Sequence, residues 1–196
     1  MVSLDVPTPS DGWDVIDKTG AKTFKVGLQL LYHPYGVIFC QQVAKKHVLF
    51  LDAKLSDIPT TVAKAVDQIC TYIKPAFLSV RTAVPAAIEA ASGRTTIVVV
   101  PTLTSDIKAV AEATPAPGIV CRPSLAKAVR ALNPNAFIIC PGVRLLGDVV
   151  NDHVGSTEFP RHADYIVVGR PITQASDPGA VYEAYVRAVY KTLNPE

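Results

Sequence analysis

The sequence has little net charge, no closely spaced cysteines and no long hydrophobic run. Among its 196 residues, 19 Lys and Arg stand against 17 Asp and Glu, a formal net charge of +2. That charge is too small and too evenly scattered for a nucleic-acid-binding or anionic-membrane surface. No apolar run approaches the roughly 18–20 residues that span a bilayer, and the amino terminus lacks the basic and apolar segments of a signal peptide. We therefore expect a cytoplasmic protein that binds a small molecule or another protein, with no nucleic-acid or membrane partner.

The four cysteines, Cys40, Cys70, Cys121 and Cys140, are widely separated along the chain. None belongs to a Cys-x-x-Cys pair and no His stands at metal-ligand spacing, so a zinc site has no support. We predict buried free thiols and no bound metal.

Length and composition place the chain among globular proteins. Hydrophobic residues make up 49% of it and charged residues 18%, unlike disordered or collagen-like chains. At about 100–200 residues per domain, residues 1–196 are expected to form one domain, large enough to fold without disulfides or metal.

Short runs rich in Val, Ile, Leu and Phe alternate with longer segments of helical spacing, which is typical of α/β proteins. The predicted strands are Val2–Val6, Thr23–Val26, His47–Leu51, Phe77–Val80, Thr96–Val100, Gly118–Cys121, Phe137–Cys140 and Tyr165–Val168. The predicted helices are Asp11–Thr19, Leu28–Lys45, Thr60–Ile73, Val84–Ala91, Asp106–Ala113, Ser124–Leu132 and Ala180–Thr192. Asp11 is the predicted cap of the first helix, and Asp177 marks the entry to the last.

Eight strands in 196 residues leave about 24 residues for each strand, helix and their connections. This length fits a compact (β/α)8 TIM barrel, and a doubly wound open sheet is the competing topology. Several runs are apolar at consecutive positions, as expected for parallel strands covered on both faces. In both topologies ligands bind at the carboxyl ends of the strands, so the polar residues that follow the apolar runs are the candidate site.

Asp52, Lys54 and Asp57 directly follow the third predicted strand. Residues two apart in extended chain share a face, so Asp52 and Lys54 would both face the barrel mouth, while Asp57 belongs to the next loop or helical turn. With Lys25 from the second strand they would form a group of two carboxylates and two ammoniums with perturbed proton affinities. The alternative is a solvated loop with a surface ion pair. The presence of Asp5 and Lys25 at neighbouring strand ends favours a site.

Gly169 and Arg170 follow the eighth predicted strand, and Pro141 and Gly142 follow the seventh. The last two loops of such barrels frequently hold phosphate through backbone N–H groups and a cationic side chain. This position favours a phosphorylated small substrate, and the alternative is an Arg paired with a carboxylate at the barrel rim.

These residues belong to motifs that a known family has in the same order, and the motifs span nearly the whole of this chain. The motifs are Leu4–Thr8, Phe24–Gly27, Asp52–Thr61, Leu103–Ser105, Pro141–Arg144 and Val168–Ile172. Together they resemble orotidine 5'-monophosphate decarboxylase, and the Asp-x-Lys-x-x-Asp-Ile-x-x-Thr block is the most specific of them.

The resemblance implies a (β/α)8 homodimer with shared active sites, no cofactor and no metal. It assigns Lys25, Asp52, Lys54 and Asp57 to the charged network of the family, with Lys54 as the proton donor. Asp57 would reach into the site of the partner subunit.

The same resemblance implies the substrate contacts. Asp5 and Lys25 would contact the ribose hydroxyls, and Thr104 and Ser105 would contact the pyrimidine. Arg170 would contact the phosphate, with Pro141 and Gly169 nearby. Ile58 and Thr61 would lie beside Asp57. The chain departs from the family in two places. The segment from Arg144 to Asp148 has no Gln to close over phosphate, and Arg81 stands where a His is expected.

Two other functions stay open. A Mg²⁺-dependent sister enzyme, such as 3-keto-L-gulonate 6-phosphate decarboxylase or hexulose-phosphate synthase, shares the Asp-x-Lys-x-x-Asp pattern, although the segment Ile58–Thr61 favours the orotidylate branch. A non-catalytic nucleotide-binding barrel is the other alternative, and the altered loop after the seventh strand is its support.

Overall fold

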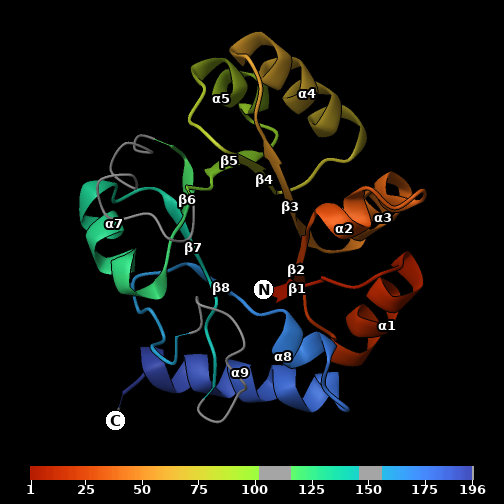
Figure 1. The fold of residues 1–196 in the computed structure, drawn as a ribbon. Helices are drawn as coiled ribbons and strands as arrows, with labels where there is room; N and C mark the ends of the chain where they lie inside the picture. Colours follow the sequence, from red (N-terminus) through yellow and green to blue (C-terminus); the bar gives the residue numbers. More distant parts are fainter. Residues whose placement is uncertain (102–115, 146–155, 196) are drawn as a thin grey trace.

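The computed structural model describes residues 1–101, 116–145 and 156–195. Its eight strands are all parallel and hydrogen-bond to one another in sequence order (Figure 1). They are β1 (Val2–Ser3), β2 (Thr23–Val26), β3 (Val48–Leu55), β4 (Phe77–Val80), β5 (Thr96–Val99), β6 (Gly118–Val120), β7 (Phe137–Pro141) and β8 (Tyr165–Val167). Each overlaps a predicted apolar run, although β1 ends at Ser3, three residues before the predicted end at Val6.

The sheet closes on itself between its first and last strands. The N–H of Ser3 donates to the carbonyl of Val168 at 2.7 Å, and Val2 forms a parallel bridge with Val168. This closure makes the sheet a (β/α)8 barrel, which confirms the predicted TIM barrel and excludes the open sheet.

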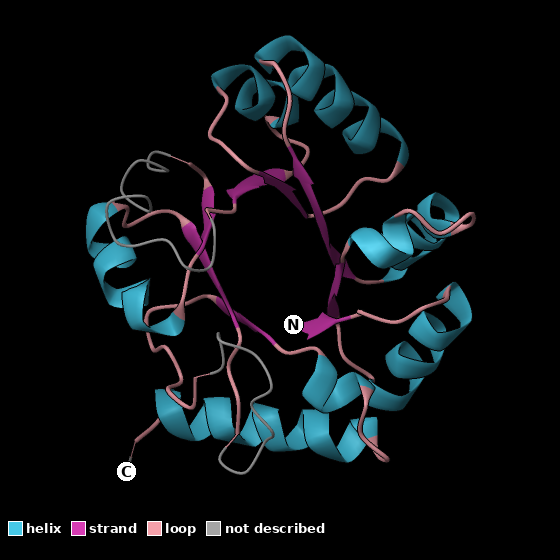
Figure 2. Ribbon diagram, viewed as in Figure 1, coloured by secondary structure: helices cyan, strands magenta, loops and turns pink. Residues whose placement is uncertain are grey.

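Helices surround the barrel (Figure 2). They are α1 (Pro9–Thr19), α2 (Leu28–Leu31), α3 (Gly36–Lys46), α4 (Pro59–Tyr72), α5 (Pro85–Ala91), a 3₁₀ turn (Pro123–Leu125), α7 (Ala126–Leu132), α8 (Arg170–Thr173) and α9 (Pro178–Leu193). The predicted helix Asp106–Ala113 lies outside the described residues.

The predicted helix Leu28–Lys45 was wrong as one element, because the structure divides it into α2 and α3. Pro34 falls between them. Proline has no N–H to donate to a helical hydrogen bond, and it disfavours the helical conformation of the residue before it. The chain then turns so tightly that a Cβ at Gly36 would clash with the carbonyl oxygen of Leu30. Glycine at this position permits the turn.

The first helix begins before its predicted cap. The hydroxyl of Thr8 accepts from the N–H of Asp11 at 3.2 Å, and the Asp11 carboxylate accepts from the N–H of Thr8 at 3.1 Å. This reciprocal capping box makes Thr8 the cap and corrects the assignment of Asp11. The predicted entry at Asp177 is confirmed, since its carboxylate accepts from the N–H of Ala180 at 2.9 Å.

The core has two layers because side chains alternate across each strand. One layer fills the barrel and includes Phe50 and Phe77, whose rings meet edge to face at 6.3 Å. The other layer packs Leu49, Leu51 and Leu78 between the strands and the helices. All four cysteines are free and buried, as predicted. Because the barrel interior is filled with apolar groups, the polar side chains that follow Phe50 on the same face mark where the site begins.

Candidate active site

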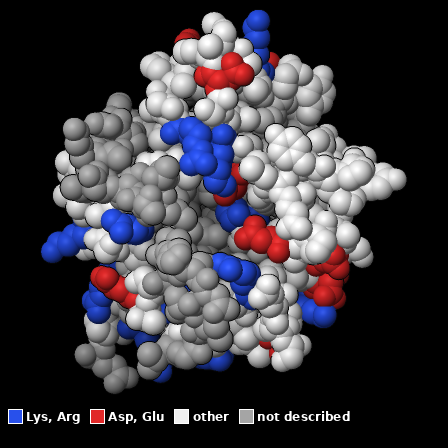
Figure 3. Space-filling view, in the orientation of Figure 1, with Lys and Arg blue, Asp and Glu red and all other residues white. Residues whose placement is uncertain are grey.

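A pocket of about 470 Å³ opens at the carboxyl ends of the strands. Seven of the predicted site residues line it: Asp5, Lys25, Asp52, Lys54, Pro141, Gly169 and Arg170. Figure 3 shows acidic and basic side chains around the central hollow of this face. The position agrees with the rule that barrels of this kind bind ligands at this end.

Strand β3 carries two of these residues and is longer than predicted. It runs to Leu55, four residues past the predicted end at Leu51, so Asp52 and Lys54 lie within the strand. They continue the inward face that begins at Phe50. Lys54 has a φ of 50°, in the left-handed region that residues other than glycine seldom adopt.

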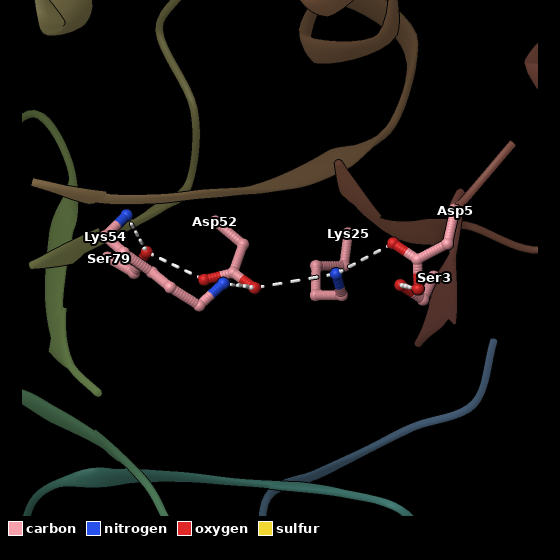
Figure 4. Close-up of polar contacts among 6 residues, drawn as sticks. All are labelled: Ser3, Asp5, Lys25, Asp52, Lys54 and Ser79. Carbon is pink, nitrogen blue, oxygen red and sulfur yellow. Dashed lines mark hydrogen bonds and ion pairs between the residues drawn. The ribbon is translucent and has the colours of Figure 1, made fainter. Parts of the chain in front are cut away.

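Four side chains, one from the loop after β1, one from β2 and two from β3, form a row of alternating charge, which we call the Asp5–Lys54 chain (Figure 4). The Nζ of Lys25 lies 3.3 Å from Oδ1 of Asp5 and 3.5 Å from Oδ2 of Asp52. The Nζ of Lys54 lies 2.6 Å from the same Oδ2 of Asp52. Each lysine therefore has an acidic neighbour, and Asp52 balances two cations.

Two serine hydroxyls, neither of which was predicted from the sequence, donate hydrogen bonds to the carboxylates of the Asp5–Lys54 chain. The hydroxyl of Ser79 on β4 donates to Oδ1 of Asp52 at 2.8 Å, and that of Ser3 on β1 donates to Oδ2 of Asp5 at 2.8 Å. Both serines are buried. Their sequence signal was a lone polar residue on the inward face of an apolar strand.

Asp52 is ionised in spite of its burial. Loss of water alone would raise the pKa of its carboxyl, but Lys25, Lys54 and the Ser79 hydroxyl together hold that pKa below its ordinary value. Favourable charges and hydrogen bonds outweigh desolvation here. The carboxylate therefore carries its charge at neutral pH.

Two glycines let the backbone approach the side chains of the Asp5–Lys54 chain closely. A Cβ on Gly169 would lie 3.1 Å from Oδ2 of Asp5, and one on Gly27 would lie 3.3 Å from Oδ1 of Asp5 and from Nζ of Lys25. Such contacts are tighter than ordinary packing. A larger residue at either position would displace the carboxylate.

Three arginines also line the pocket. Arg170, the first residue of α8, lines it as predicted. Arg144 and Arg81 line it too, and Arg144 is buried with its Nη1 donating to the carbonyl of Val143 at 3.0 Å. Guanidinium groups suit phosphate and carboxylate ligands because their donors form a fixed fork. Arg144 had been noted only as part of a motif.

The predicted residues after β3 lie elsewhere. Asp57, Ile58 and Thr61 are exposed, and Oδ1 of Asp57 accepts from the N–H of Ile58 at 2.7 Å. Within one subunit the second carboxylate of the charged group is therefore Asp5 and not Asp57. The predicted pyrimidine contacts Thr104 and Ser105 fall outside the described residues.

No group of three or more His, Cys, Asp or Glu side chains converges to hold a metal in the parts of the chain that the structure describes. None of the helices in those parts is long and apolar enough to cross a membrane.

Comparison with known proteins identifies the family. The family model described as orotidine 5'-phosphate decarboxylase / HUMPS family matches residues 1–185. A protein of Thermobifida fusca named orotidine 5'-phosphate decarboxylase is 36% identical over 97% of this chain and 95% of its own length. A protein of the same name from Cereibacter sphaeroides is 34% identical over 92% of each chain.

Solved structures share the fold. The crystal structure of orotidine 5'-phosphate decarboxylase from Lactobacillus acidophilus superposes with a TM-score of 0.75 and 24% identity, covering 96% of this chain and 97% of that one. The enzyme from Methanocaldococcus jannaschii, complexed with the inhibitor BMP, has a TM-score of 0.73 and 22% identity, covering 96% and 97%.

Proposed function

Since the chain belongs to the orotidine 5'-phosphate decarboxylase / HUMPS family, we propose that it converts orotidine 5'-monophosphate to uridine 5'-monophosphate in pyrimidine biosynthesis. The observation that carries the proposal is the Asp5–Lys54 chain at the rim of the pocket. The shared name of the relatives from Thermobifida fusca and Cereibacter sphaeroides supports the choice of substrate.

Loss of CO₂ from C6 of orotidylate leaves an electron pair with no adjacent π system to receive it. Stabilisation must come from placed charge and an available proton. Lys54 serves both needs, because its ammonium offsets the developing negative charge and then delivers its proton to C6. The new C–H bond replaces the broken C–C bond, and Lys54 is left neutral until it regains a proton from solvent.

Asp52 is the counterion of Lys54 before the reaction. Its carboxylate lies 2.6 Å from the Lys54 ammonium. The same carboxylate would also lie near the carboxylate of the bound substrate, which disfavours the ground state relative to the product.

Remote contacts must supply much of the rate enhancement, because slow reactions of this kind require a barrier reduction of about 20 kcal/mol. We propose that Arg170, with the backbone around Gly169 and Pro141, holds the phosphate, and that Arg144 adds charge on the same side. Asp5 and Lys25 hold the ribose hydroxyls. Binding energy from these contacts then excludes water from C6.

We also propose that two copies of the chain form a dimer with shared sites. Asp57, Ile58 and Thr61 are exposed in one subunit, as a role in the partner's site requires. Tyr32 and Tyr35 near α2 and α3 are 81% and 66% exposed, and Ile58 is 64% exposed. Figure 3 shows a largely uncharged face over α2 and α3, and large exposed apolar surfaces are usual at protein interfaces.

The test is the ultraviolet absorbance of orotidylate followed with purified protein, with the product identified as uridylate. We propose no cofactor, so turnover should continue in EDTA. Loss of activity in EDTA and its return with Mg²⁺ would favour the sister phosphosugar enzymes, and binding of uridylate without turnover would favour a non-catalytic barrel.

A further inference from the structure

Three residues of β3 lie opposite one residue of β4. Leu51 and Leu55 of β3 pair with the residues on either side of Ser79, so the segment 52–54 lies opposite Ser79 alone. Such a bulge removes the extra residues from the regular hydrogen-bond ladder between the strands. It falls on the two members of the Asp5–Lys54 chain that lie closest to each other, Asp52 and Lys54.

The bulge leaves the N–H of Lys54 in need of a partner. Its φ of 50° is unfavourable for a residue with a side chain, and a buried N–H without a partner would add a further cost. The hydroxyl oxygen of Ser79 accepts this N–H at 2.8 Å. The side chain of Ser79 therefore replaces the backbone partner that the bulge removes.

The same hydroxyl fixes the orientation of the Asp52 carboxylate. It donates its one proton to Oδ1 of Asp52 at 2.8 Å, which leaves Oδ2 for Lys54 and Lys25. A serine hydroxyl has one donor and two acceptor positions, so both contacts can form together. Ser79 is fully buried, so water does not compete for them.

We propose that Ser79 is the positioning residue for decarboxylation, because one hydroxyl holds both the backbone of Lys54 and the carboxylate of Asp52. This inference rests on the proposed function. Ser79 itself does not line the pocket in the described part of the chain, so it acts through Lys54 and Asp52. Without the hydroxyl, Asp52 can rotate and Lys54 can leave its left-handed conformation, and the ammonium loses its direction toward C6.

Removal of the hydroxyl should therefore lower turnover more than binding. We expect Ser79→Ala to reduce kcat by about ten- to a hundredfold, the range set by loss of a hydrogen bond to a charged group. KM should change less than about threefold, because contacts to ribose and phosphate remain. Ser79→Thr keeps the hydroxyl and should recover most of the lost kcat.

The pH profile gives a second readout. Asp52 faces Lys25 on β2, Lys54 on its own strand and Ser79 on β4, and Arg81, directly after β4, lines the same pocket. Since the Ser79 hydroxyl is one of the groups that lower the pKa of Asp52, its loss should move the acid limb of kcat to higher pH.

The control is Thr19→Ala at the end of α1, which deletes another buried hydroxyl. The hydroxyl of Thr19 donates a hydrogen bond to the carbonyl of Val15. It should lower the melting temperature and leave kcat unchanged. The proposal is overturned if Ser79→Ala keeps kcat within about twofold of the unmodified enzyme, or if Ser79→Thr is as impaired as Ser79→Ala.

Hydrogen exchange tests the same contact without turnover. The Lys54 amide should exchange slowly in the unmodified protein and faster in Ser79→Ala, whereas fast exchange in the unmodified protein contradicts the proposed contact. An unmodified protein that fails to consume orotidylate overturns the proposed function instead, so the two failures are distinguishable.

Discussion

The ammonium of Lys54 lies 2.6 Å from a carboxylate oxygen of Asp52, two residues earlier on the same strand. Both residues line the pocket. Lys25 reaches the same oxygen from the neighbouring strand. One carboxylate therefore balances two ammoniums, and the removal of any of the three changes the charge environment of the others.

Replacement of Lys54 by Ala should abolish turnover while leaving nucleotide binding nearly intact. We expect kcat to fall by at least about a thousandfold, since both the proton donor and the local positive charge are lost. Uridylate affinity measured by calorimetry should change by less than about tenfold, because the proposed ribose and phosphate contacts remain. Lys18→Ala, which removes an exposed lysine paired with Asp14 on α1, is the matched control. Normal turnover by Lys54→Ala would remove Lys54 as the proton donor.

Replacement of Asp52 by Asn should lower both activity and stability. The change leaves Lys25 and Lys54 as neighbouring cations without their shared counterion. We expect unfolding free energy to fall by about 1–3 kcal/mol, below the usual cost of breaking a fully buried pair because Lys54 is partly solvated. Added salt should recover part of this loss by screening the repulsion. Urea unfolding at low and high salt measures both effects. A variant as stable as the unmodified protein would contradict the expected loss and show that the ion pairs only offset the cost of burying the carboxylate.

The barrel could be predicted from the sequence because its strands are buried on both faces. Runs such as Val48–Leu51 are apolar at consecutive positions, which distinguishes parallel covered strands from half-exposed ones. The division between α2 and α3 was missed because apolar residues recur at helical spacing across Pro34. Helix α8, four residues long, is shorter than the window over which periodicity can be recognised.

The site residues that lie at the ends of strands could be predicted from the sequence. Asp52, Lys54 and Lys25 follow apolar runs, and the fold brings strand ends together. Ser79 was not recognised, because one serine inside an apolar run carries no sign of the carboxylate that it meets on the neighbouring strand β3. The left-handed conformation of Lys54 could not be predicted either, since local preference opposes it and tertiary contacts impose it.

Orotidine without its phosphate should lose turnover as well as affinity. If phosphate contacts supply energy for catalysis, kcat/KM should fall by at least about a thousandfold for the unphosphorylated nucleoside. Arg170→Ala should be strongly impaired with orotidylate and should match the unmodified enzyme with orotidine, because the lost contact has no partner there. Equal impairment of Arg170→Ala with both substrates would show that Arg170 supports the fold and does not bind phosphate. Steady-state kinetics with the two substrates decides between these outcomes.

A mixture of two inactive variants should regain activity if the sites are shared between subunits. Lys54→Ala and Asp57→Ala would each disable every site of a homodimer. A heterodimer of the two carries one site with both native residues and one site with neither. Random exchange of equal amounts should therefore restore about a quarter of the unmodified activity, since half the dimers are mixed and each has one intact site. No recovery after exchange verified by mass spectrometry, or activity in a monomer by sedimentation, would place Asp57 outside the partner's site.

His47 should make the fold less stable as the pH falls below neutrality. Burial, together with Lys22 and Lys46, lowers the pKa of this imidazole below its ordinary value, although Asp17 opposes the shift. Its Nδ1 is buried without a hydrogen-bond partner among the described residues, and its ring packs edge to face on Phe24. The unfolded chain therefore takes up a proton first as the pH falls through about 6.5, and stability is lost from there down to the lower pKa of the folded state.

Urea unfolding between about pH 7.5 and 5.5 should show this loss in the unmodified protein and a flatter profile in His47→Gln. His162→Gln serves as the control, and identical profiles for His47→Gln and the unmodified protein would assign the acid sensitivity to other groups.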